Sequence, residues 1–159
     1  MLVEPEIPPN TGNIARLCGA TQSHLHLVGK LGFRIDEHSV RRAGLDYWHL
    51  VQVETHDSLT AAESSIARKS TEPPTTWLFS GKARRSYLDV DLRLGDLLVF
   101  GKESVGLPQE LLAERSAEVV GIPTLGAVRS LNLANSVAIA VYEVLRRHGL
   151  LAIGRGPTG

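Results

Sequence analysis

Three short segments of the chain combine polar side chains with turn residues in patterns that could support chemistry on a ligand. In the first, PPNTGNIAR from Pro8 to Arg16, two prolines and an Asn-Thr-Gly turn precede a predicted helix. Asn13 and Arg16 are three residues apart, so they lie on one face of that helix. A guanidinium near a helix start is well placed to bind a phosphate. The alternative is a capped surface helix that carries an ordinary arginine.

The second segment is FGKESVGLP, from Phe100 to Pro108. A strand is expected to end there in a loop with two glycines, followed by a proline suited to the first position of a helix. Glu103 could accept hydrogen bonds from a substrate. The pattern is neither a Walker loop nor the G-x-G-x-x-G dinucleotide fingerprint, so phosphate binding is not its obvious use. A plain strand–turn–helix joint would have the same spacing.

The third segment, IPTLGAVRSLN, runs from Ile122 to Asn132. A strand is expected to end near its proline, and we predict that Ser130 is the N-cap of a long helix. Unpaired backbone N–H groups at such a helix start can bind an acceptor. Capping and substrate contact are compatible, so Ser130 could do both or could only cap its helix.

Strand and helix patterns alternate along the chain and predict how these segments are positioned. The expected strands are Leu2–Glu4, His24–Val28, Thr76–Ser80, Leu97–Phe100 and Val119–Ile122. The expected helices are Gly12–Thr21, Ser58–Arg68, Pro108–Glu114 and Leu131–Arg147. The alternation predicts an α/β domain over residues 1–150 with a mainly parallel sheet covered by helices on both faces. Ligands of such sheets bind beyond the carboxyl ends of the strands, where the three segments fall.

The last predicted helix has an unusually wide apolar face. At roughly 100° per residue its apolar positions cover an arc of about 140°. They are Leu133, Ala134, Val137, Ala138, Val141, Val144 and Leu145. Such a helix could bury one flank in its own core and the other in a second subunit. A helix deep in the core of a monomer would show the same pattern.

Composition narrows the class of protein. The chain has 159 residues, of which 43% are hydrophobic and 21% charged, as in an ordinary globular domain. It has no apolar stretch of the roughly 20 residues that a membrane span needs and no signal-peptide pattern. Cys18 is the only cysteine, which excludes an internal disulfide and favours a cytoplasmic location. Cysteine and histidine do not recur with zinc-site spacing, so we expect no metal. Residues 151–159 are expected to form a flexible tail.

Charge neither requires nor excludes a nucleic-acid partner. Seventeen basic residues balance seventeen acidic ones, whereas proteins that bind phosphate backbones are commonly basic. Binding depends on local clusters, however. The candidates are Arg41 with Arg42, Lys82 with Arg84 and Arg85, and Arg146 with Arg147. Each cluster could equally be a solvated surface pair.

Taken together, the three segments resemble the three signature motifs of the SPOUT methyltransferases, the superfamily with a trefoil knot. PPNTGNIARLC is similar to the first motif, FGKESVGLP to the second and IPTLGAVRSLNLANSVAIAVYE to the third. The intervening LGFRIDEHSVRRAGLDYW resembles the small branch of tRNA (cytidine/uridine-34) 2′-O-methyltransferases. The resemblance extends from about Val3 to Arg147, and three motifs in the right order make it specific.

The resemblance implies a fold, a reaction and partners. The fold would be a single-domain α/β SPOUT fold with a C-terminal trefoil knot, which is a rare exception to ordinary chain connections. The reaction would be methyl transfer from S-adenosyl-L-methionine to the ribose 2′-hydroxyl of the wobble nucleotide, with the tRNA anticodon stem-loop as substrate. Family members are homodimers with cofactor pockets near the subunit interface, which fits the wide apolar arc.

The resemblance also assigns residues. The residues that it assigns to catalysis are Arg16, Glu103, Ser130 and Asn132. The residues that it assigns to binding of the methyl donor are Leu78, Phe79, Gly101, Ile122, Ser130 and Leu131. Contacts with RNA are expected from Asn10, Asn13, Arg41 and Arg42. The chain departs from the family in its short first strand and at Lys102, where proline is common and where the lysine places an extra cation near the site.

We expect catalysis without a metal, by alignment and by stabilisation of charge on the acceptor oxygen. Guanidinium has a pKa above about 12 and is a poor base. Arg16 is therefore expected to hold the adjoining phosphate and stabilise the 2′-oxygen, while Ser130 and Asn132 orient the ribose. The alternatives are a SPOUT 2′-O-methyltransferase of rRNA or of another tRNA position, and a non-catalytic RNA-binding dimer. A metabolic nucleotide-binding enzyme would need a glycine fingerprint that the chain lacks.

Overall fold

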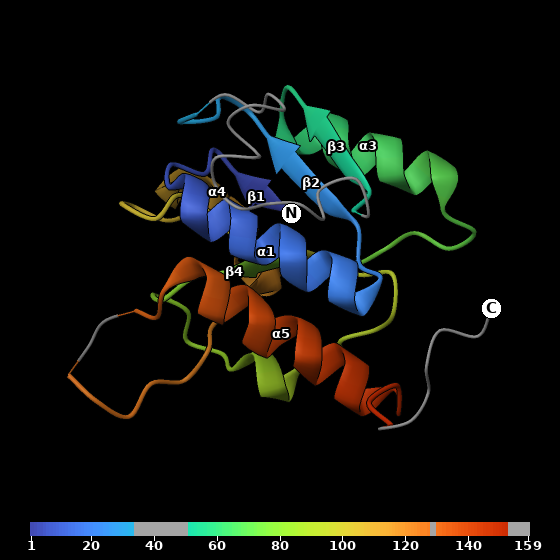
Figure 1. Cartoon of the computed structure of the whole chain (residues 1–159). Helices are drawn as coiled ribbons and strands as arrows, with labels where there is room; N and C mark the ends of the chain where they lie inside the picture. Colours follow the sequence, from blue (N-terminus) through green and yellow to red (C-terminus); the bar gives the residue numbers. More distant parts are fainter. Residues whose placement is uncertain (34–50, 128–129, 153–159) are drawn as a thin grey trace.

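The computed structural model describes residues 1–33, 51–127 and 130–152 (Figure 1). The predicted RNA contacts of Arg41 and Arg42 lie outside the described residues, as does the segment around them that resembles the wobble-specific branch. The predicted tail at 151–159 is described only at its first two residues, both of which are exposed.

Within the described residues, six parallel strands form two three-stranded sheets that meet edge to edge. The first sheet has the order β1-β2-β3, with strands at Leu2–Val3, Leu25–Val28 and Val53–His56. The second has the order β5-β4-β6, with strands at Leu97–Val99, Thr76–Phe79 and Val119–Val120. Every strand pair is parallel. A parallel bridge between Leu2 and Phe100 joins the sheets, so the predicted mainly parallel α/β arrangement is confirmed.

Helices cover both faces of this sheet. They are α1 (Pro8–Thr21), α3 (Leu59–Lys69), α4 (Gln109–Glu114) and α5 (Leu133–Arg147). Figure 1 shows α1 and α5 side by side in front of the sheet, and α3 beside β3 behind it. The described part of the chain also contains the 3₁₀ turns η2 (Tyr87–Asp89) and η3 (Ser116–Glu118). None of the helices in the described ranges has the length and hydrophobicity needed to cross a membrane.

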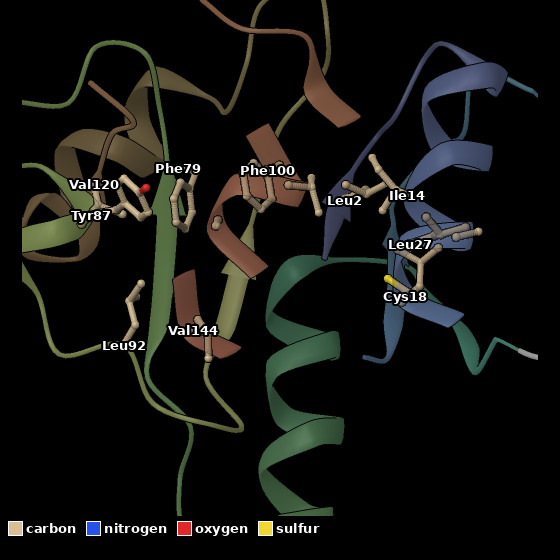
Figure 2. Packing of buried hydrophobic residues seen from close by; sticks show 14 of the residues in the cluster. Leu2, Ile14, Cys18, Leu27, Phe79, Tyr87, Leu92, Phe100, Val120 and Val144 are labelled. Atoms are coloured by element: carbon tan, nitrogen blue, oxygen red, sulfur yellow. The ribbon is translucent and has the colours of Figure 1, made fainter. Parts of the chain in front are cut away.

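The core has two parts because alternate strand residues point to opposite faces. Phe79 faces α1 and α5, whereas Leu78 faces α3 and α4. Figure 2 shows Phe79 between Tyr87 and Phe100. The Phe79 and Phe100 rings stack with centroids 4.6 Å apart. These aromatic residues lie at the ends of β4 and β5, and the second motif loop departs from β5.

The structure corrects the predicted start of each of the two long helices. Helix α1 begins at Pro8 rather than Gly12, because proline is tolerated in the first turn, where its missing N–H is not needed. Helix α5 begins at Leu133 with Asn132 as its N-cap, so the prediction that Ser130 caps this helix was wrong. The predicted strands are present: β2 begins one residue later than predicted and ends at Val28 as predicted, and the other four end one or two residues earlier, whereas β3 was not predicted.

Candidate active site

Three loops at the carboxyl ends of β4, β5 and β6 and the approach to α5 enclose a cavity of about 610 Å³. Residues 79–82 follow β4 and residues 100–106 follow β5. Ile122 and Thr124 follow β6, and residues 130–133 lead into α5. The second and third motif segments, together with Asn10 of the first, therefore meet at one cavity, where an α/β sheet usually binds its ligand. We call it the donor cavity.

Most residues expected to bind the methyl donor line the donor cavity. They are Phe79, Gly101, Ile122, Ser130 and Leu131. Leu78 is not among the lining residues, because its side chain is fully buried on the opposite face of β4. The sheet alternation that sends Phe79 toward the cavity sends its neighbour away from it.

Close packing of the β5 loop accounts for the glycine at position 101. A Cβ built on Gly101 would lie 2.2 Å from the carbonyl carbon of Gly106, which no side chain allows. Gly106 itself has a φ of +76° and donates its N–H to the Lys102 carbonyl over 2.9 Å. The loop is thus a tight turn that only glycine permits at both positions.

The Glu103 carboxylate anchors the segment that leads into α1. It accepts hydrogen bonds from the backbone N–H groups of Glu6 (2.8 Å) and Ile7 (3.3 Å) and from Nδ2 of Asn10 (3.1 Å). Helix α1 has neither a side-chain cap nor an acidic residue in its first turn. Glu103 supplies the negative charge from a loop that is distant in the sequence, and a negative charge at a helix N-terminus is stabilising. Its carboxylate is therefore engaged within the protein.

A hydrogen bond between two asparagines connects the starts of α1 and α5. Nδ2 of Asn132 donates to Oδ1 of Asn10 over 3.0 Å. Oδ1 of Asn132 accepts from the backbone N–H groups of Ala134 (2.9 Å) and Asn135 (3.3 Å). Glu103, Asn10 and Asn132 thus form one continuous hydrogen-bonded chain, the Glu103–Asn132 network. Asn10 is buried within it, and its contact with RNA stays a prediction.

Arg16 and Asn13 lie on the exposed face of α1 beside this network. They line a second, more open cavity of about 550 Å³ between α1 and α5, which we call the helix groove. Asn10 and Asn132 line both the helix groove and the donor cavity. The two cavities are therefore adjacent, with the Asn10–Asn132 hydrogen bond at their boundary. Asn135, which was not predicted as a site residue, also lines the helix groove.

The extra cation at position 102 is paired. Nζ of Lys102 lies 2.7 Å from the Glu4 carboxylate, and this hydrogen-bonded contact lowers the pKa of Glu4 and raises that of Lys102. Oε2 of Glu6 accepts from the backbone N–H of Ser104 over 3.1 Å. Together with Glu103, these contacts tie residues 4–7 to the β5 loop at three points.

Among the other predicted basic clusters, some side chains make contacts within the protein and one faces the donor cavity. Arg85 lies over the Trp77 ring, 5.5 Å from its centroid, and donates to the Ala117 carbonyl. Arg146 and Arg147 both bind the Glu143 carboxylate, and their hydrogen bonds lower the pKa of Glu143 to about 2. Lys82, by contrast, is exposed and lines the donor cavity. Lys82 is thus the member of these clusters placed to meet a ligand there.

Comparisons with known proteins place this arrangement in a family. The sequence profile of the SpoU rRNA Methylase family matches residues 1–142. A putative tRNA (cytidine(34)-2′-O)-methyltransferase of Geobacillus stearothermophilus is 43% identical over 155 residues, which cover 94% of this chain and 96% of that protein. The tRNA (cytidine(34)-2′-O)-methyltransferase of Saccharophagus degradans is 43% identical over 150 residues, 94% of each chain.

A similar solved structure comes from work on the 2-OH methylation of C/U34 on tRNA. It superposes with a TM-score of 0.83 at 42% identity and covers 93% of each chain. The resemblance drawn from the three motifs is thereby confirmed over nearly the whole sequence. The chain belongs to the SpoU methylase family.

Proposed function

We propose that this protein transfers a methyl group from S-adenosyl-L-methionine to the ribose 2′-hydroxyl of nucleotide 34 in the tRNA anticodon loop. The observation that carries the proposal is the adjacency of two cavities. A donor cavity built by two motif loops and the loop after β4 shares Asn10 and Asn132 with a groove that presents Arg16. Relatives 43% identical over almost their whole length are named for this reaction at cytidine 34.

The donor cavity suits an adenosyl group. It combines apolar side chains such as Phe79, Ile122 and Leu131 with close-packed backbone around Gly101. Apolar walls can hold an adenine ring, while exposed main-chain groups select its polar edge. When bound, S-adenosyl-L-methionine supplies a methyl group activated by a positively charged sulfur. Ser130 would contribute a hydroxyl at the rim of the cavity.

Arg16 is placed to act on the acceptor side. A guanidinium stays protonated at neutral pH, so it cannot take the proton of a ribose hydroxyl. It can hold the phosphate next to that ribose and stabilise negative charge as it develops on the 2′-oxygen. Asn132 and Ser130 would orient the ribose, and Asn13 would extend the contact along the groove. This scheme requires no metal ion.

We also propose that the protein works as a homodimer through α5. One flank of this helix is buried in the core through Val137, Ala140 and Val144. The opposite flank of α5 leaves Ile139 and Tyr142 exposed, at 38% and 47%. Large apolar side chains that are exposed on a flank turned away from the protein's own core are typical of a helix that packs against a second subunit. A second subunit covering this flank would bring its own surface close to the helix groove.

Three further expectations come from the family resemblance and from the sequence pattern. They are a trefoil knot in the C-terminal part, a cytoplasmic location, which also suits tRNA as the substrate, and a single domain over residues 1–150. Each belongs to the proposal with the reaction itself.

Nucleoside mass spectrometry of tRNA tests the reaction. A strain that lacks this gene should lose 2′-O-methylation at position 34, and the wild-type gene should restore it. Loss at another tRNA position or in rRNA would contradict the proposed substrate. Unchanged methylation throughout, together with retained RNA binding by the purified protein, would favour a non-catalytic RNA-binding dimer.

A further inference from the structure

We propose that His26, Glu54 and His56 form a binding site for a divalent transition-metal ion of the Zn²⁺ class. The three side chains lie on adjacent strands β2 and β3, and each offers one ligand atom within 4.8 Å of the others. None of them lines the donor cavity or the helix groove. The site is therefore separate from the machinery of methyl transfer.

Sheet register brings these residues together. His26 pairs directly with Glu54, and Val28 pairs with His56 one step further on. Because alternate residues of a strand share a face, His26, Glu54 and His56 all point to the side that α3 covers. The backbone of two hydrogen-bonded parallel strands thus fixes the relative positions of all three.

The distances suit metal coordination. Nδ1 of His26 lies 3.0 Å from Nε2 of His56. Two nitrogen ligands on a tetrahedral zinc ion, each bonded at about 2.0–2.1 Å, lie about 3.3–3.4 Å apart. Binding of the ion would therefore move the two nitrogens apart by a few tenths of an ångström and replace the hydrogen between them, with each neutral imidazole carrying its proton on its other ring nitrogen.

The ligand types indicate which cation would bind. Imidazole nitrogen suits zinc, copper and nickel, whereas calcium and magnesium prefer sites built of oxygen. Two histidines and one carboxylate provide three ligands and leave a fourth position for water, as in many zinc sites. His26 is 7% exposed, but the Glu54 side chain is 39% exposed. An ion can thus enter from the Glu54 side.

Lys69 competes for the same carboxylate. Its Nζ lies 2.8 and 3.0 Å from the two oxygens of Glu54. A metal ion bound by Glu54 must share that carboxylate with the ammonium or displace it. Removal of the lysine should therefore strengthen metal binding if Glu54 is a ligand. A histidine pair with a purely structural role predicts no such effect.

Zinc titration of the untagged full-length protein tests the proposal. We expect one Zn²⁺ per chain by isothermal titration calorimetry. The melting temperature should rise by about 5–10 °C when free Zn²⁺ exceeds Kd by about a hundredfold, since the ion binds only the folded state. His56→Asn should weaken binding at least tenfold and abolish the shift, because it removes one of the three protein ligands. Lys69→Met should tighten binding.

His24→Ala is the matched control. His24 is exposed, and its ring centroid lies 6.4 Å from that of His26, yet it is outside the cluster. It should leave both the affinity and the thermal shift unchanged. Absence of binding up to millimolar Zn²⁺ would overturn the proposal, as would equal affinity in His56→Asn and wild type. If Lys69→Met binds Zn²⁺ with unchanged or weaker affinity, Glu54 is not a ligand, and this result would also overturn the proposal.

Discussion

Nδ2 of Asn132 donates a hydrogen bond to Oδ1 of Asn10 across 122 residues of sequence. This bond lies where the donor cavity meets the helix groove. On one side it continues through Nδ2 of Asn10 to Glu103, and on the other Asn132 caps α5. The starts of two helices and one motif loop are thereby held in a fixed relation at the point where donor and acceptor would meet.

Asn132→Asp should keep the capping of α5 but disrupt the hydrogen bond to Asn10. Aspartate caps helices as well as asparagine does, so stability should change by less than about 1 kcal/mol. It has no N–H to donate, however, so either the bond to Asn10 is lost or Asn10 turns its oxygen toward Glu103. Methyl transfer should fall at least tenfold, as expected for misplaced reacting groups. Urea unfolding and single-turnover rates check this.

Ser58→Ala is the matched control for that variant. The Ser58 side chain caps α3 by accepting a hydrogen bond from the Ala61 N–H over 3.2 Å. Ser58 lines neither the donor cavity nor the helix groove. Its loss should cost about 1 kcal/mol without slowing the reaction. If Asn132→Asp reacts at the wild-type rate, the network does not position the site.

Glu103→Gln should destabilise the protein as well as slow it. One carboxylate oxygen is replaced by an NH₂ group that faces backbone N–H groups, and the negative charge at the start of α1 is lost. We expect a loss of about 1–2 kcal/mol in the free energy of unfolding. Glu110→Gln, an exposed residue of α4, is the control. Normal stability with lost activity would instead assign Glu103 to direct substrate contact.

Gly101→Ala should abolish binding of S-adenosyl-L-methionine. The added methyl group would meet the backbone of Gly106 and force the β5 loop open. Calorimetry should detect at least a hundredfold weaker binding, or a chain with reduced stability, because backbone clashes in close-packed regions are not relieved locally. Gly126→Ala has open space around its Cβ and should bind normally. Wild-type affinity in Gly101→Ala would show that the loop does not form the pocket.

Stability should depend on Glu143 at acid pH. The Arg146 and Arg147 side chains hold its pKa at about 2, below the ordinary value of 4.5. A lowered pKa means that the ion pairs stabilise the fold above about pH 4.5 and that this contribution disappears as pH falls toward 2.

Glu143→Gln should therefore cost about 0.5–1 kcal/mol at pH 7. Its difference from wild type should shrink as pH falls from 4.5, as measured by urea unfolding. Glu114→Gln, exposed at the end of α4, is the control. A difference that stays constant down to pH 3 would contradict the pairing.

Long periodic segments could be predicted from the sequence, and short polar ones could not. Helices α3 and α5 were found to within one or two residues at each end because their apolar spacing is regular. Strand β3 was not predicted, because its sequence VETH contains no apolar run. The proximity of His26, Glu54 and His56 depends on the register of that strand, so no zinc-like spacing is visible in the sequence.

Local rules also left the site's internal contacts undetermined. Ser130 and Asn132 are both good N-cap residues, and only the observed helix start decides between them. The role of Glu103 depends on a contact with residues almost a hundred positions earlier. The motifs predicted which loops converge, but not which polar groups are already used within the protein.

Arg16 is the residue on which the proposed reaction depends most. Single-turnover methylation of an anticodon stem-loop with cytidine at position 34 can be measured alongside calorimetry of S-adenosyl-L-methionine binding. Arg16→Ala should slow transfer at least a hundredfold while changing donor affinity less than about twofold, because Arg16 lines the helix groove and not the donor cavity. Arg68→Ala, exposed on α3, should behave as wild type, and a 2′-deoxycytidine substrate should accept no methyl group. Equal losses of transfer and donor binding in Arg16→Ala, or methylation of the deoxy substrate, would contradict the account.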